Sequence, residues 1–116
     1  MVLGLGIDLV ETERLAAALA RTKGQSAACA TRADRVQALA ARFAAKEACL
    51  KALGTGWSAG LGFRQVEVVK EASGSPALRL HGAAAQKAKA LGVTRIHVSL
   101  THQAGAAAAV VVLEGD

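Results

Sequence analysis

The spacing of hydrophobic and polar residues along the chain predicts alternating strands and helices. Stretches rich in Val, Ile and Leu, or alternating apolar with polar residues, predict strands at 2–11, 63–71, 77–82, 95–102 and 106–114. Apolar residues three or four positions apart predict helices at 11–24, 36–53 and 83–92. Residues 25–35 lack a clear period, and we expect a loop there. Within the first strand, Gly4 and Gly6 either weaken the strand or let another backbone approach it closely.

This order of elements predicts an α+β fold with a mostly antiparallel sheet packed with helices. A chain of 116 residues suits a single domain, which we expect to span residues 1–116. Hydrophobic residues make up 53% of the chain but aromatic residues only 3%, so the core must consist mainly of Leu, Val, Ile and Ala. A core of this kind in so short a chain favours oligomerisation.

The net charge indicates which partners the protein can bind, and the number of cysteines indicates the cellular compartment. A net charge of +5 favours an acidic partner, which could be nucleic acid, a phosphorylated ligand or an acidic protein. Cys29 and Cys49 do not form a disulfide framework and are expected to be thiols in a reducing cytosol. No apolar run approaches the roughly 18 residues of a membrane span, and the N-terminus lacks the pattern of a signal peptide. The sequence therefore predicts a soluble, cytoplasmic protein with no membrane partner.

The predicted helix at 36–53 has charged residues where its core-facing stripe should be apolar. On a helical wheel, Lys46 falls within this stripe and Glu47 lies at its edge; the stripe itself consists of Leu39, Phe43, Leu50 and Leu53. A charge on a buried face costs several kcal/mol, by an order-of-magnitude estimate, unless a partner compensates it. Glu47 could form an ordinary i,i+4 pair with Lys51. Alternatively, these charges belong to a functional site.

Three further features of the sequence are ambiguous when taken singly. Asp8 lies in an apolar strand and is either a carboxylate at the strand end facing water or a buried metal ligand. His102 ends an inward-facing row and is either structural or part of a site. The turn that begins at Gly54 is either a plain helix C-cap or an anion-binding loop. Taken together, two carboxylates and several cations favour Mg²⁺ and phosphoryl transfer, because Mg²⁺ binds through one or two carboxylates and phosphate oxygens.

Three sequence motifs are distinctive: GIDLVETER at 6–14, RFAAKEACLKALGTG at 42–56 and HVSLTH at 97–102. In this order they resemble the motifs of the bacterial holo-acyl-carrier-protein synthases, the small members of the 4′-phosphopantetheinyl transferases. The resemblance implies the 4′-phosphopantetheinyl transferase fold and a cytoplasmic homotrimer with active sites between neighbouring subunits. It also implies transfer of phosphopantetheine from coenzyme A to a serine of apo acyl carrier protein, an acidic partner, with release of adenosine 3′,5′-bisphosphate.

The same resemblance implies roles for individual residues. Asp8 and Glu47 would hold Mg²⁺ and, with Lys51, form the catalytic group. Arg14 and Arg21 would face the acidic carrier protein. The residues that would seat coenzyme A are Arg42, Lys46, Gly54, Thr55, Gly56, Pro76 and His102.

Two departures from the family pattern leave alternatives open. The segment between Arg14 and Arg42 is shorter than is usual, and Ser75 stands where relatives often carry a lysine. A family member with altered carrier specificity or lost activity is therefore one alternative. A basic nucleic-acid-binding domain is another, although a chain with no Tyr and one Trp can hardly supply the stacking platforms that single-strand readers need. We therefore expect no nucleic-acid partner.

Overall fold

The computed structural model describes residues 1–22, 33–54 and 62–116. Its elements follow the predicted order and confirm an α+β fold. They are β1 (Val2–Glu11), α1 (Thr12–Thr22), α3 (Ala33–Leu53), the 3₁₀ turn η1 (Phe63–Gln65), β2 (Val66–Lys70), β3 (Pro76–Leu80), α4 (Gly82–Leu91), β4 (Arg95–Gln103) and β5 (Ala106–Glu114).

The structure corrects three predicted boundaries. Helix α3 begins at Ala33, so the end of the predicted 25–35 loop is helical, while residues 25–32 lie outside the described part. Residues 63–65 form a 3₁₀ turn and not the start of a strand. Pro76, which lies just before the strand predicted at 77–82, is instead the first residue of β3 and lies opposite Lys70. A proline is tolerated there because the first residue of a strand can do without a backbone donor.

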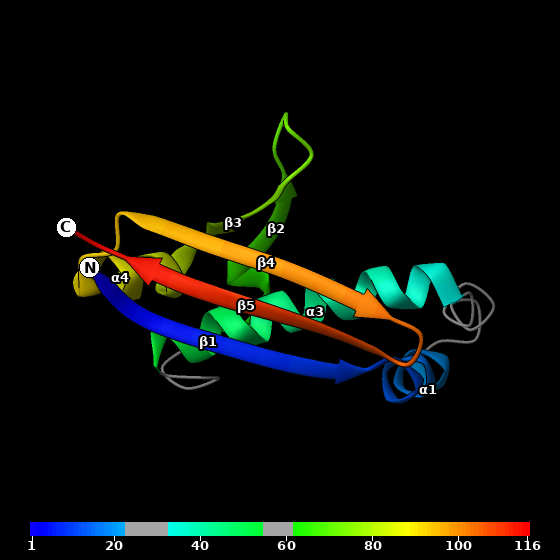
Figure 1. The fold of residues 1–116 in the computed structure, drawn as a ribbon. Coiled ribbons are helices and arrows are strands. Elements are labelled where there is room, and N and C mark those ends of the chain that lie inside the picture. The colour runs from blue at the N-terminus through cyan, green and yellow to red at the C-terminus, as the bar shows by residue number, and fades with distance from the viewer. Residues whose placement is uncertain (23–32, 55–61) are drawn as a thin grey trace.

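The strands form two antiparallel groups. β1, β5 and β4 form a three-stranded sheet in that order, and β2 and β3 form a separate hairpin. Figure 1 shows α3 running along one face of the three-stranded sheet, with the hairpin projecting beyond β4. The core lies between α3 and this face of the sheet, and the side chains of Ala44, Ala45 and Ala48 are completely buried in it.

Two glycines let β1 lie directly on the backbone of α3. A Cβ atom on Gly6 would overlap the carbonyl oxygen of Ala48, and one on Gly4 would overlap that of Ala52. Of the two interpretations of these glycines, close backbone approach is therefore correct. Because Gly4 and Gly6 meet successive turns of α3, the next inward residue of the strand, Asp8, is also directed toward the helix.

The leucine stripe predicted for α3 covers only part of its buried surface. Leu50 and Leu53 are buried as expected, whereas Leu39 and Phe43 are partly exposed. The ring of Phe43 packs edge-on against Phe63, with 4.5 Å between the centroids. The contact with the sheet is made largely by alanines, because only small side chains allow the helix and the strands to come so close.

The opposite face of the three-stranded sheet carries exposed aliphatic side chains. On β1, Leu5, Ile7 and Leu9 are 63%, 66% and 69% exposed. Ile7 lies opposite Val110 of β5, and Leu5 lies opposite Val112. One face of the sheet is thus covered by α3, while the other is apolar and open in the single chain. No helix within the described ranges is long and apolar enough to cross a membrane.

Candidate functional site

Asp8 lies on the face of β1 that is directed toward α3. Its side chain is only 15% exposed, so it is not a strand-end carboxylate in open water. The Nζ of Lys51 lies 3.0 Å from Asp8 Oδ1 and donates a second hydrogen bond, of 3.1 Å, to the carbonyl oxygen of Ile7. These contacts bring a carboxylate and an ammonium group together from the first strand and the long helix.

Glu47 lies one helical turn before Lys51 and is half-buried. The i,i+4 interpretation of the sequence paired these two residues, but the ion pair that Lys51 forms in the structure is with Asp8. Asp8 is thus in direct contact with Lys51, and Glu47 precedes Lys51 by one turn of the same helix. Phosphoryl transfer depends mainly on positioning and on neutralising charge, and charged groups from β1 and α3 could serve it.

The donor set of Asp8 and Glu47 fits a magnesium ion. Within the described ranges, no group of three or more His, Cys, Asp or Glu side chains gathers in a way that could hold a metal. Mg²⁺ does not need such a group, because it binds through one or two carboxylates and keeps several of its waters. The half-buried carboxylate of Asp8 is the kind of hard oxygen ligand that this ion prefers.

Lys46 is compensated within the protein. Its Nζ donates a hydrogen bond of 3.3 Å to the carbonyl oxygen of Phe63 and lies 5.9 Å from the centroid of the Phe63 ring. The aliphatic stem of a lysine can cover apolar surface while its charged end reaches a polar partner. This contact explains how a lysine can occupy the predicted apolar stripe.

Three of the residues predicted to bind coenzyme A line one groove. Arg42 of α3, Pro76 of β3 and His102 of β4 border a groove of about 550 Å³, together with the turn residues Gly74 and Ser75. Asp8, Glu47 and Lys51 do not line it. The predicted site residues therefore form two groups within one chain, one around Lys51 and one in this groove.

The remaining predicted residues lie at the end of α3 and on α1. Gly54 has a φ of +85°, and its amide donates a hydrogen bond to the carbonyl oxygen of Lys51, which is the geometry of a helix C-cap. Thr55 and Gly56 lie outside the described residues. Arg14 is highly exposed and lies 3.7 Å from Glu11 Oε1. Arg21 belongs to the last turn of α1, and its side chain is outside the described part.

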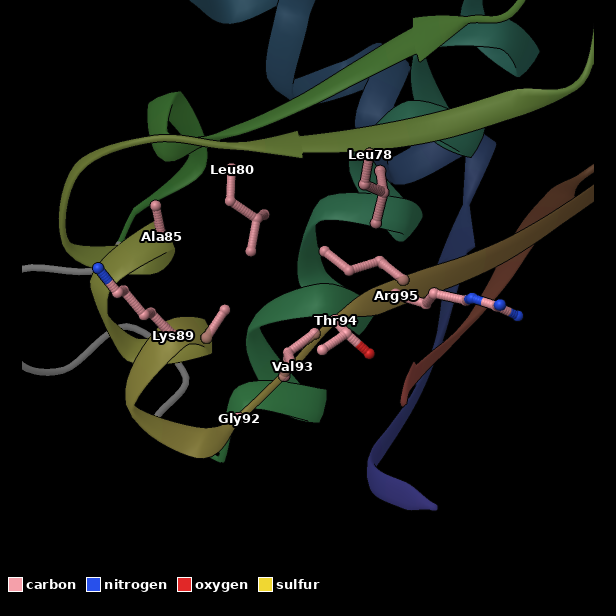
Figure 2. A pocket seen from close by; sticks show the side chains of 10 residues that line it. Leu78, Leu80, Ala85, Lys89, Gly92, Val93, Thr94 and Arg95 are labelled. Carbon is pink, nitrogen blue, oxygen red and sulfur yellow. The ribbon is translucent and has the colours of Figure 1, made fainter. Parts of the chain in front are cut away.

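Two further hollows contain residues that sequence reasoning did not select. The first, of about 580 Å³, lies where β3, β4 and α4 meet (Figure 2) and is bordered by aliphatic side chains such as Leu78, Leu80 and Ile96. None of the predicted site residues lines it.

The second hollow, of about 370 Å³, is basic and includes Arg64 and His81. Neither residue was given a role from the sequence. The pairing of Val66 with Leu80 brings Arg64 and His81 together at the base of the hairpin. Recognising the hairpin and its register is the signal by which this pair could have been found.

Comparison with known proteins places these features in a family. Residues 4–111 match the model of the 4′-phosphopantetheinyl transferase superfamily. A holo-[acyl-carrier-protein] synthase of Solidesulfovibrio magneticus is 49% identical over an alignment that covers 99% of this chain and 100% of that protein.

Solved structures agree with the sequence match. The acyl carrier protein synthase of Mycobacterium tuberculosis is 38% identical, with a TM-score of 0.72 and full coverage of both chains. The Helicobacter pylori holo-[acyl-carrier-protein] synthase in complex with coenzyme A is 28% identical, with a TM-score of 0.75 and coverage of 95% and 99%. The motif around Asp8, the helix that carries Glu47 and Lys51, and the fold that joins them thus lie in a chain that belongs to the 4′-phosphopantetheinyl transferase superfamily.

Proposed function

We propose that this chain is a holo-[acyl-carrier-protein] synthase, which transfers the 4′-phosphopantetheine group from coenzyme A to a serine of apo acyl carrier protein. In this reaction the serine hydroxyl oxygen forms a bond to the phosphorus that bears pantetheine, and the pyrophosphate linkage breaks to release adenosine 3′,5′-bisphosphate. The observation that carries the proposal is the contact between the half-buried Asp8 and Lys51, within the matched family region.

Asp8 and Glu47 are proposed to hold Mg²⁺ against the pyrophosphate, where the ion would neutralise charge that develops during transfer. Lys51 adds a positive charge beside Asp8, since two of its three donors are engaged by Asp8 Oδ1 and the carbonyl oxygen of Ile7. This charge is proposed to stabilise the leaving bisphosphate and to help orient Glu47 or a bound water, either of which could take the serine proton.

The groove lined by Arg42, Pro76 and His102 is proposed to seat coenzyme A. Lys46 and the Gly54–Gly56 turn, which the resemblance assigns to the same ligand, are proposed to contribute from outside this groove. Arg42 supplies a fork of donors suited to a phosphate, and His102 at the end of β4 supplies a second polar group. The exposed Arg14, with Arg21 further along α1, is proposed to face the acidic surface of the carrier protein.

The open aliphatic face of the sheet supports a homotrimer. Leu5, Ile7 and Leu9 form, with Val110 and Val112, an exposed apolar surface of the kind that marks a protein–protein interface. Because the family resemblance implies active sites between neighbouring subunits, we propose that the groove of one subunit meets the Lys51 group of its neighbour in this assembly. This would explain why the two groups of site residues are separate in one chain.

The decisive experiment is mass spectrometry of an apo acyl carrier protein incubated with this protein, coenzyme A and Mg²⁺. We expect the mass of the carrier to increase by one phosphopantetheine group. A carrier whose modified serine is replaced by alanine is the matched control and should gain no mass. If no increase occurs with any of several fatty-acid and polyketide carriers, the proposal is wrong, and a family member without transfer activity is indicated.

A further inference from the structure

A small basic hollow at the base of the β2–β3 hairpin is separate from the Lys51 group. It has a volume of about 370 Å³, and its lining includes cationic side chains from two elements. Arg42 and Lys46 come from α3, and Arg64 comes from η1. The other lining residues are Val66, Glu67, Val68 and His81.

The charges around this hollow do not balance. Arg42, Lys46 and Arg64 are opposed by one lining carboxylate, that of Glu67. Glu67 already has a partner, because His81 Nε2 lies 2.9 Å from its Oε1. The hydrogen bond from His81 is the main cause that lowers the pKa of Glu67, so this carboxyl is ionised at neutral pH. The hollow therefore keeps an excess of positive charge.

The hollow also has donors arranged for a small anion. Lys46 is held in place by its hydrogen bond to the carbonyl oxygen of Phe63, which uses only one of its three donors. α4 begins directly after His81, so the positive end of this helix dipole lies beside the hollow. Guanidinium groups are well suited to phosphate, because they donate two parallel hydrogen bonds to its oxygens.

We propose that this hollow binds a phosphate group, with Arg64 as its principal ligand beside Arg42 and Lys46. The anion is either free inorganic phosphate or a phosphate of a nucleotide such as adenosine 3′,5′-bisphosphate. Arg42 lines both this hollow and the groove assigned to coenzyme A, so an anion bound here can draw Arg42 away from that groove. Binding itself requires no transfer activity, and it can be tested even if the proposed function is wrong.

The test is a titration of the ¹⁵N-labelled protein with inorganic phosphate, at fixed pH and ionic strength, followed by NMR. The probes are the His81 ring and the backbone amides of Val66 and Glu67. Arg64→Gln is compared with Arg79→Gln, which removes the same charge from the neighbouring strand β3 at a position that does not line the hollow. Both arginines are exposed, so both variants should fold, and their amide spectra would verify this.

We expect saturable shifts at these probes and a dissociation constant raised by at least about tenfold in Arg64→Gln, against less than about twofold in Arg79→Gln. A parallel titration with adenosine 3′,5′-bisphosphate separates the two sources. If it shifts the same probes in an Arg64-dependent way, a nucleotide phosphate occupies the hollow; if only inorganic phosphate does so, the ligand is the free anion. Shifts that do not saturate with either ligand, or equal weakening by both substitutions, would overturn the proposal.

Discussion

The Nζ of Lys51 lies 3.0 Å from Asp8 Oδ1, joining residues that are 43 positions apart in the chain. The side chain of Lys51 is 52% exposed and that of Asp8 only 15%, so the ammonium group lies on the solvent side of a half-buried carboxylate. A surface pair of this kind typically contributes only about 0–1 kcal/mol to stability. The pair therefore contributes little to holding the fold together, and its proposed role is to place charge where phosphate would bind.

The Lys51→Met substitution tests this interpretation. We expect kcat to fall at least about a hundredfold while the fold remains intact, which is the scale of losing one preorganised contact to the transition state. Lys89→Met is the matched control, because Lys89 lies on α4, away from both groups of site residues, and should leave kcat unchanged. Single-turnover kinetics measures the rate of transfer in both variants, and thermal melts verify that both are folded. A Lys51→Met enzyme within about threefold of the parent would remove Lys51 from the catalytic group.

The metal assignment predicts that Asp8→Asn and Glu47→Gln each lower activity far more than the exposed Asp116→Asn does. A carboxamide keeps the shape of the side chain but loses the negative charge that Mg²⁺ requires. Electron paramagnetic resonance with Mn²⁺ as the probe should show weakened ion binding in both site variants, independently of turnover. Full activity in excess chelator would contradict a metal requirement.

Carrier recognition should depend on Arg14. Reversing this exposed charge in Arg14→Glu is expected to raise the KM for the acidic carrier protein much more than the KM for coenzyme A, because like charges now meet across the contact. The difference between variant and parent should shrink as salt is added, since exposed charges are screened. Equal changes in both KM values would assign Arg14 another role.

The order of elements could be predicted from the sequence because hydrophobic periodicity reports which face of each element is buried. The boundaries were less accurate: α3 begins at Ala33, before its leucine stripe does, and Phe63 belongs to a 3₁₀ turn. Periodicity also selected leucines as the buried face of α3, whereas Ala44 and Ala48 form much of its contact with the sheet. Alanine carries little hydrophobic signal, so its importance became visible only when β1 was placed on the helix.

The candidate site was predicted mainly from motifs, and its arrangement was not. From the sequence, the expected partner of Lys51 was Glu47, one helical turn away, because a helical wheel relates only residues within the same helix. The contact with Asp8 depends on how β1 crosses α3, which no local pattern encodes. Arg64 and His81 were missed for the same reason, since they meet only through the register of the hairpin. The single domain over 1–116 stays a prediction, as do the site roles.

The packing of β1 on α3 predicts a large effect of Gly6→Ala on stability. The added Cβ would overlap the carbonyl oxygen of Ala48, so the strand or the helix must shift. Overpacking of this kind typically lowers the free energy of unfolding by about 1–3 kcal/mol. Gly62→Ala is the control, because its φ is −162° and a Cβ there meets no atom within 4 Å. Urea denaturation at one protein concentration compares the two variants; equal midpoints would show that β1 is not so tightly packed.

The exposed face of the sheet predicts that Ile7→Lys dissociates the proposed trimer without unfolding the chain. Ile7 is 66% exposed in the single chain, so a lysine there remains hydrated and costs the monomer little. In an assembly through this face the same charge would be buried without a partner, which is strongly unfavourable.

Leu91→Lys on α4 is the matched control, since Leu91 is also an exposed aliphatic residue but lies off this face. Sedimentation velocity should give a monomer for Ile7→Lys and a trimer for Leu91→Lys and the parent. Transfer activity should fall with the trimer, because the groove of one subunit would no longer meet the Lys51 group of the next. If Ile7→Lys sediments as the parent does, the subunits do not associate through this face.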